Sequence, residues 1–378
     1  MADADYAAAF LDWLGCAAGG VDERAALAAG ELGDPVLRAA TAGHVLDFDD
    51  TYLPGIAHLS APTAPAALVV GAGIGVSIGQ ALEAYAAGFE AMGALARASH
   101  PALYDRGLHP TAACGALGAA VATARLTGAP AATSAAIALL GTGGLRAAFG
   151  TDGKSLQVGL GAAAGVRAAR LAAAGARVGL EAAARGFEQA TGGTYAEPDP
   201  AERAIDANWI KAWPCCLQTH GSIEAALLLR GADAWPVAVV VHPVSLQAAG
   251  VGPRPEDGLQ AKFSIPYVAA HTLLHGEPDQ SSFDAVDDAV CELAATIQVR
   301  TDAELLESEA VLLGGDGAEL VRVEAARGSP ERPLDGAALE AKLHALAGDR
   351  LDGALDDPER PAQDVLEAAL GVDSATGG

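Results

Sequence analysis

Small residues fill most of the apolar positions of this chain, and this feature restricts its fold more than any other. Hydrophobic residues make up 51% of the sequence, yet aromatic residues make up only 4%. Alanine, leucine, valine and glycine must therefore build the core. Side chains of this size fill a core only where neighbouring backbones approach closely. The sequence therefore favours closely packed helices.

Apolar residues recur with the helical period through most of the first 210 residues. Clusters of glycine and proline separate the periodic segments, as is typical of loops. The pattern predicts helices at residues 6–19, 36–51, 64–97, 111–126, 131–140, 155–174 and 178–189. The second of these predicted helices contains the densest polar cluster of the chain.

The character of the sequence changes after about residue 234. Short β-rich runs lie at residues 236–241, 297–299, 310–313 and 320–324, and the glycines between the last two indicate a hairpin. Single cores stop growing at roughly 250–300 residues, so a chain of 378 residues is expected to form two domains. The sequence predicts a mainly α protein, with a large all-helical domain at residues 1–211 and 331–378 and a smaller α/β lid domain at residues 212–330.

Charge and composition exclude several classes of partner. The formal net charge is −25, which repels nucleic acid and anionic membrane surfaces. Residues 61–79 are apolar but rich in alanine, glycine and proline, which disfavours a membrane span. The chain starts MADADY, without the basic residues of a secretory signal or a transit peptide, so the expected location is the cytoplasm. The five cysteines form no CxxC pair and are expected to be reduced thiols.

The polar cluster in residues 44–51 is the first candidate for a functional site. In a helix, a turn of about 100° per residue would place His44, Asp47 and Thr51 on one side and Asp49 opposite them. A carboxylate and a hydroxyl one turn apart could then face a common cavity. The alternative is an exposed acidic helix end that precedes the break at Pro54.

Two histidines and several lysines are further candidates. His58 and His109 each precede a predicted helix within a loop, where an imidazole is well placed for acid–base chemistry. Lys154 opens a predicted helix, an unfavourable place for a cation unless an anion binds there. Lys211 and His220 bracket a short Trp-Pro-Cys-Cys segment.

The scarcity of lysine adds weight to these positions. Four lysines stand against nineteen arginines, so each lysine indicates a place where a compact ammonium group is needed. The alternative is chance retention on the surface.

Two other kinds of site are disfavoured. The glycines at 71, 73 and 75 imitate a dinucleotide-binding loop, but Val76 stands where its third glycine belongs and no clear strand precedes it. The histidines form no HExxH pair, and Cys215 and Cys216 lack the spacing of zinc or iron–sulfur ligands. The spacing therefore requires no metal.

Several motifs taken together resemble the MmgE/PrpD family. They lie at residues 44–51 with His58 downstream, 107–111, 153–157, 211–220, 261–267 and 328–342, in the family's order. The resemblance extends from about residue 40 to 348. One departure is His58-Leu-Ser, where the family usually has His-Pro-Ser.

The resemblance implies a homodimeric enzyme that works without metal or organic cofactor. The family includes 2-methylcitrate dehydratase, cis-aconitate decarboxylase and iminodisuccinate epimerase, which share proton transfer next to a carboxylate. Carried over to this sequence, the catalytic positions fall on Asp47, His109, Lys154 and His220, and the substrate-binding positions on Thr51, His58 and Lys211.

The resulting hypothesis is a dehydratase or decarboxylase that acts on a small polycarboxylate. Lys154 and Lys211 would hold a substrate carboxylate and stabilise the charge that develops on it. His109 or His220 would transfer the proton, and Asp47 would hold an imidazole in its useful tautomer or act as partner acid. Two alternatives remain open, an epimerase or isomerase of an imino or amino diacid, and a non-catalytic binding paralogue.

Overall fold

The computed structural model of this protein describes residues 4–232 and 235–371, which divide into two compact units. Of the described residues, the helical unit comprises 4–45, 49–210 and 335–371, and the α/β unit comprises 46–48, 211–232 and 235–334. The predicted fold class is confirmed, since helices predominate and the larger sheet lies in the second unit. The tripeptide Leu46–Phe48 belongs to the α/β unit, which the sequence did not predict.

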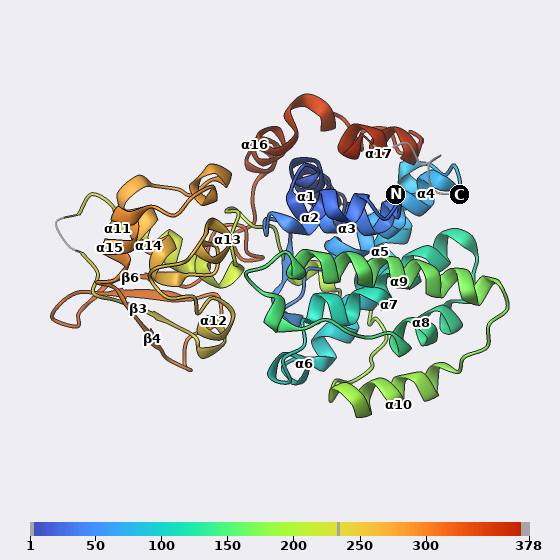
Figure 1. The fold of residues 1–378 in the computed structure, drawn as a ribbon, viewed down its shortest axis with the longest axis horizontal. Helices are drawn as coiled ribbons and strands as arrows, with labels where there is room; N and C mark the ends of the chain where they lie inside the picture. Colours follow the sequence, from blue (N-terminus) through green and yellow to red (C-terminus); the bar gives the residue numbers. More distant parts are fainter. Residues whose placement is uncertain (1–3, 233–234, 372–378) are drawn as a thin grey trace. The chain divides into compact units, whose positions relative to one another are not determined.

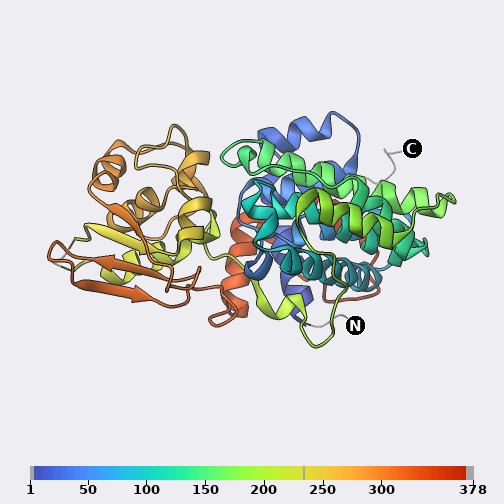
Figure 2. The same ribbon diagram turned by 90° about the horizontal axis from the view of Figure 1, so that it is seen from below.

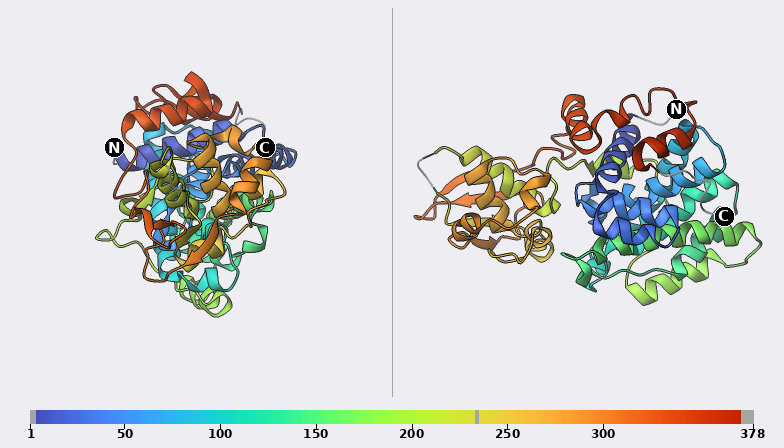
Figure 3. Two further views of the ribbon diagram at one scale, coloured as in Figure 1. Left: turned by 90° about the vertical axis from the view of Figure 1, so that its left-hand side faces the viewer. Right: turned by 45° about the horizontal axis from the view of Figure 1, so that its top comes forward.

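The helical unit contains twelve α-helices within the described residues. They are α1 (Ala4–Gly20), α2 (Arg24–Gly30), α3 (Pro35–Val45), α4 (Ser60–Gly73), α5 (Ile78–Ser99), α6 (Ala102–Asp105), α7 (Pro110–Thr127), α8 (Ala131–Leu140), α9 (Gly153–Ala173), α10 (Leu180–Thr191), α16 (Gly336–Ala347) and α17 (Ala362–Leu370). The last two pack against α1, so the end of the described chain completes the core that its beginning starts (Figures 1 and 3).

Helix α7 lies at the centre of this unit and packs against α4, α5, α8 and α9 (Figure 1). Glycines permit the closest approaches. A Cβ atom at Gly165 would lie 2.3 Å from the carbonyl oxygen of Ala116, and one at Gly88 would lie 2.5 Å from that of Gly118. Neither position can hold a larger residue without moving a backbone. The helices therefore pack as closely as the small-residue composition predicts.

Two of the predicted helices are wrong in extent. The helix expected at residues 64–97 is interrupted between α4 and α5, where Gly75 has φ +73° and Ser77 begins α5 with a capping box. The helix expected at residues 36–51 ends at Val45, and Thr51 lies instead in the short strand β1 (Thr51–Tyr52), which pairs with β2 (Asn208–Trp209).

The reason for the early end of α3 lies in the residues that follow it. Asp47 has φ +53°, in the left-handed region that a helix cannot include. The Lys211 ammonium donates to the Asp47 carbonyl, and the Lys262 ammonium donates to the Leu46 carbonyl. Side chains distant in sequence thus satisfy carbonyls that helical N–H groups would otherwise bind.

The α/β unit is built on a four-stranded sheet. Its strands are β3 (Ala238–Val241), β4 (Gln298–Thr301), β5 (Ala310–Leu313) and β6 (Glu319–Val323), in the order β4-β3-β5-β6 (Figures 1 and 2). Strand β3 runs parallel to β4 and antiparallel to β5. The predicted hairpin is confirmed, since β5 and β6 pair antiparallel around Gly317. Its helices are α11 (His220–Leu229), α12 (Pro243–Ala248), α13 (Gly258–Ala261), α14 (Ile265–His275) and α15 (Asp288–Ala294).

Two further sequence predictions concern membranes and thiols. Among the described residues, every helix is too short or too polar to cross a bilayer. All five cysteines are buried thiols.

Candidate active site

A buried group of His44, Asp49 and His58 lies at the end of α3 and the start of α4 in the helical unit. The Nδ1 atom of His44 lies 2.9 Å and 3.1 Å from the two carboxylate oxygens of Asp49. The Nδ1 atom of His58 lies 3.2 Å from Asp49 Oδ2. The three residues are 8% exposed or less. Asp49 therefore accepts from two imidazole rings inside the protein.

The charge state of Asp49 follows from this arrangement. Its complete burial would raise the pKa, but the charges of His44 and His58 and their hydrogen bonds to the carboxylate oppose this effect. The two rings prevail and hold the pKa of Asp49 well below 3.8. Asp49 is a residue that the sequence placed on the wrong side of a predicted helix, and it is the carboxylate that holds the imidazole of His58.

Thr51 and Thr111 fix the remaining surroundings of His58. The Thr51 hydroxyl lies 3.4 Å from Nδ1 of His58, and the Thr111 hydroxyl accepts the His58 backbone N–H at 3.0 Å. Thr111 is in the first turn of α7. The ring therefore keeps a defined position although Leu59 replaces the proline usual in the family motif.

His109 lies immediately before α7 and stacks on His44, with ring centroids 6.0 Å apart and an interplanar angle of 22°. Its Nδ1 atom lies 2.7 Å from the amide nitrogen of Gln157, in the first turns of α9. Phe149 meets the His109 ring edge to face at 4.9 Å. The structure thus brings His109 to the same group as His44 and His58.

Lys154 also lies in the first turn of α9, as predicted, three residues before Gln157. The residue is 7% exposed, and its ammonium lies 5.8 Å from the centroid of the Phe149 ring. Because Gln157 contacts His109 and Phe149 contacts both His109 and Lys154, the lysine belongs to the histidine group. The helix dipole is unfavourable to a cation at the N-terminus. A lysine at this place therefore suits a site that binds an anion.

The α/β unit contains a second group of predicted residues. The fully buried ammonium of Lys211 donates to the Asp47 carbonyl at 2.9 Å and to the Asp47 carboxylate at 3.0 Å. Lys262 donates to the Leu46 carbonyl at 2.7 Å. Two lysines therefore hold the tripeptide in which Asp47 has its left-handed conformation. Strain of this kind is typical of functional positions.

His220 begins α11 in the same unit. It is fully buried, and its ring meets Trp213 edge to face at 5.0 Å between centroids. The guanidinium of Arg327 lies over the Trp213 ring, 5.2 Å from its centroid. His220 is thus held by an aromatic contact.

All four lysines of the chain are buried, at 7% exposure or less. Lys342, the fourth, forms an ion pair with the equally buried Asp12 at 2.5 Å. Chance retention of lysine on the surface is therefore excluded. From the sequence, Lys154 and Lys211 received specific roles and Lys262 did not, although it lies in the motif at residues 261–267.

One group of residues could hold a metal ion by proximity. The ligand atoms of His44, Asp49 and His58 lie within 4.8 Å of one another. The spacing of these residues in the sequence did not indicate it. Their separations of 2.9–3.2 Å are those of hydrogen bonds, which the protons on the two Nδ1 atoms supply. Hydrogen bonding accounts for the arrangement without an ion.

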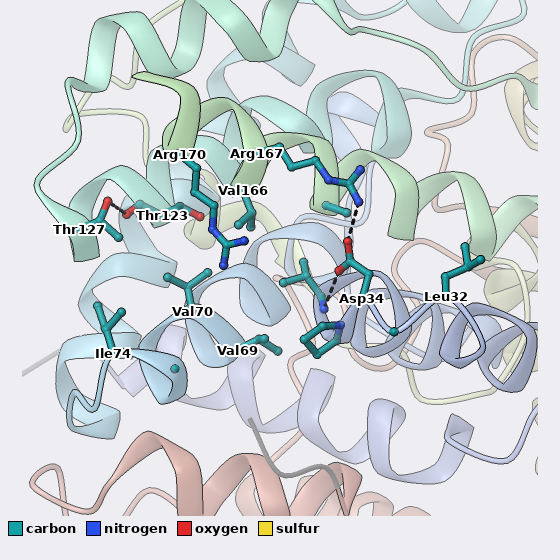
Figure 4. A pocket seen from close by; sticks show the side chains of 15 residues that line it. Leu32, Asp34, Val69, Val70, Ile74, Thr123, Thr127, Val166, Arg167 and Arg170 are labelled. Carbon is teal, nitrogen blue, oxygen red and sulfur yellow. Dashed lines mark hydrogen bonds and ion pairs between the residues drawn. The ribbon is translucent and has the colours of Figure 1, made fainter. Parts of the chain in front are cut away.

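A cavity of about 530 Å³ elsewhere in the helical unit is lined by none of the predicted site residues. Valine side chains and Arg170 line it together with Arg167, which pairs with Asp34 at 2.7 Å (Figure 4). The candidate site therefore rests on the histidine group and not on this cavity.

Comparison with family models agrees with these observations. The MmgE/PrpD N-terminal domain matches residues 34–196, and the MmgE/PrpD C-terminal domain matches residues 213–368. The chain belongs to the MmgE/PrpD family. The matched N-terminal segment contains the whole histidine group and Lys154, and the C-terminal one contains His220 and Lys262. A search of curated proteins found no match to this chain.

Membership of the MmgE/PrpD family supports a dehydratase-type lyase or a related enzyme in general terms.

Proposed function

We propose that this MmgE/PrpD protein is a cofactor-independent lyase, a dehydratase or decarboxylase, that acts by acid–base proton transfer next to a carboxylate of a small polycarboxylate. The observation that carries the proposal is the buried pair of His58 and Asp49, with His109 and Lys154 in the same group of residues. An imidazole bound through one nitrogen to a buried carboxylate is a base whose protonated form is stabilised.

Lys154 is proposed to bind the substrate carboxylate. When the neighbouring C–H bond loses its proton, negative charge spreads onto that carboxylate, and a fixed ammonium stabilises it. Thr51 is proposed to orient the substrate beside His58. Asp47, Lys211 and His220 are proposed to take part as the family resemblance implies, with Lys211 holding the carboxylate of Asp47.

An epimerase remains the second candidate, because returning the proton on the opposite face needs the same base. Loss of hydroxide from that carbanion makes a dehydratase, whereas in a decarboxylase carbon dioxide leaves from the neighbouring carbon and the same imidazole supplies a proton in its place. The chemistry of the histidine group serves all three outcomes, so the products must distinguish them.

The test is solvent exchange in deuterium oxide with a panel of polycarboxylates, hydroxy acids and imino or amino diacids. NMR would follow both deuterium at the carbon next to the carboxylate and the appearance of an alkene or an inverted centre. The expected result is exchange that His58→Asn abolishes. A ligand that binds tightly without any exchange would identify a binding protein and refute the proposal.

A further inference from the structure

The Nδ1 atoms of His58 and His109 face hydrogen-bond partners of opposite kind, an acceptor for His58 and a donor for His109. The Nδ1 atom of His58 faces the Asp49 carboxylate at 3.2 Å, and a carboxylate of low pKa can only accept. The Nδ1 atom of His109 faces the Gln157 amide nitrogen at 2.7 Å, which can only donate. Nδ1 of His58 must therefore bear a proton, and Nδ1 of His109 must offer its lone pair.

The orientation of the Gln157 amide is fixed by the backbone of Leu145. The Leu145 N–H donates to Oε1 of Gln157 at 2.8 Å, and Nε2 of Gln157 donates to the Leu145 carbonyl at 3.1 Å. Turning the amide over would set donor against donor and acceptor against acceptor. The hydrogen-bond partners therefore fix which end of the amide faces His109.

The loop that carries Leu145 is held in turn against the segment that carries His109. The His109 N–H donates to the Gly144 carbonyl at 3.1 Å, and the Arg146 N–H donates to the Gly107 carbonyl at 2.9 Å. These bonds fix the position of the Gln157 amide relative to the His109 ring. The arrangement is built into the fold of the helical unit.

We infer that His58 is the base that takes the substrate proton, and that His109 is an uncharged hydrogen-bond donor to the substrate, with Asp49 and Gln157 as the positioning residues that fix these two roles. The inference rests on the proposed function for its substrate, but its statement about protonation does not.

The proposed step at His58 balances as follows. The C–H bond next to the carboxylate breaks, its proton binds Nε2 of His58, and its electron pair passes onto the carbon and the carboxylate. The imidazolium that forms keeps the proton on Nδ1 and donates it as a hydrogen bond to the Asp49 carboxylate. Because that carboxylate is ionised and wholly buried, it stabilises the new positive charge strongly.

The role of His109 differs from the proton transfer that the sequence suggested for it. A second proton on Nδ1 would confront the Gln157 amide donor, so His109 stays neutral and donates through Nε2. A neutral imidazole can stabilise charge on a substrate oxygen without releasing its proton, as in triosephosphate isomerase. His109 would then act beside Lys154 on the same carboxylate.

The decisive experiment is long-range ¹H–¹⁵N NMR of the whole protein labelled with ¹⁵N-histidine, with His58→Asn and His109→Asn used to assign the signals. His58 is expected to carry its proton on Nδ1, and His109 to remain a neutral Nε2–H imidazole throughout the titration range of ordinary histidines, roughly pH 5 to 8. A cationic His109 near neutral pH, or one with the proton on Nδ1, would overturn the inference.

Gln157→Glu tests the cause, because it keeps the shape and replaces the donor by an acceptor. The variant is expected to turn His109 into a titrating imidazolium, to add an ionisation to the pH profile of kcat, and to lower kcat by about a hundredfold. Gln189→Glu, at an exposed position of α10, is the matched control and should change neither. An unchanged His109 spectrum in Gln157→Glu would refute the role of Gln157.

The NMR experiment needs no substrate, so the two proposals fail separately. Absence of turnover with every compound of the panel would count against the proposed function. It would not bear on the inferred protonation states, because the spectra of His58 and His109 test these without substrate.

Discussion

Asp50 offers the clearest quantitative test of the structure. Burial, with further contributions from the charges of Asp12 and Asp49, raises the pKa of Asp50 from 3.8 to about 7, although hydrogen bonds from Ser60 and Asn208 oppose the rise. The Ser60 hydroxyl lies 2.7 Å and the Asn208 amide nitrogen 2.8 Å from Oδ2 of Asp50. Asp50 is thus a carboxyl group that the folded protein keeps protonated when the unfolded chain has released the proton.

The sign of the stability effect follows from this difference. Below about pH 4 both states bind the proton, and the contribution to the free energy of unfolding is fully present. It falls as the pH rises towards the folded-state value of about 7 and is constant above it. The rise from 3.8 to about 7 corresponds to about 4 kcal/mol.

Asp50→Asn removes the ionisation while keeping the shape. The new amide nitrogen replaces one of two oxygens that both accept hydrogen bonds, from Ser60 and Asn208, so the substitution also costs stability by an amount that does not depend on pH. Urea unfolding of variant and wild type between about pH 4 and pH 8 gives the difference in unfolding free energy, in which the other acidic groups cancel. This difference should shift in favour of the variant by about 4 kcal/mol over the range.

The matched control is Asp22→Asn, the same substitution at an exposed position, which should not reproduce the shift of about 4 kcal/mol expected for Asp50→Asn. Parallel stability curves for Asp50→Asn and wild type would show that Asp50 ionises alike in both states, and the reasoning about its burial would be wrong.

Four other predictions concern the site and the assembly. Lys154→Arg should lower kcat/KM about a hundredfold with the fold intact by circular dichroism, because the planar guanidinium cannot replace a compact buried ammonium; near-normal turnover would reduce Lys154 to a diffuse charge. Lys211→Met should cost about 3–5 kcal/mol in urea unfolding, because it leaves the Asp47 carboxylate buried without this ammonium. The double variant Lys211→Met with Asp47→Asn, which removes the buried charge and keeps a residue that tolerates the left-handed backbone, should recover part of that stability but no activity. Dialysis against a chelator should leave turnover unchanged, whereas loss of activity that zinc restores would make His44, Asp49 and His58 metal ligands. Light scattering should give a dimer of the 37.6 kDa chain, and a monomer at micromolar concentration would contradict the two-fold assembly.

The fold could be predicted largely because its signals are local. Glycine and proline mark the ends of most helices, so α8 and β5 begin and end at the predicted residues. The end of α3 could not be predicted, since Lys211 and Lys262 determine it from more than 160 residues away, through bonds to the Asp47 and Leu46 carbonyls. Such long-range contacts leave no periodicity in the sequence.

The sequence proposed candidate site residues but not the partners that the structure gives them. The resemblance indicated His58 and His109, yet the carboxylate that holds an imidazole was expected at Asp47, because a continuous helix turned Asp49 away. The left-handed backbone at Asp47 reverses that geometry. Gln157 carried no signal of its own, since its importance depends on the Leu145 backbone that orients its amide.

Three carboxyl groups within four residues show how strongly the local surroundings change the properties of identical side chains. Asp47 pairs with a lysine, Asp49 accepts from two histidines, and Asp50 bonds to a serine and an asparagine with no cation among these partners. The pKa of Asp49 is consequently held well below 3.8, while that of Asp50 rises to about 7. Asp49 therefore stays ionised at neutral pH and can support a protonated His58. The charge of Asp49 contributes to raising the pKa of the next residue, Asp50. Asp50 therefore gains or loses its proton near neutrality instead. A pH effect on activity near neutrality that Asp50→Asn removes would thus belong to Asp50, and one that survives in that variant would have another origin.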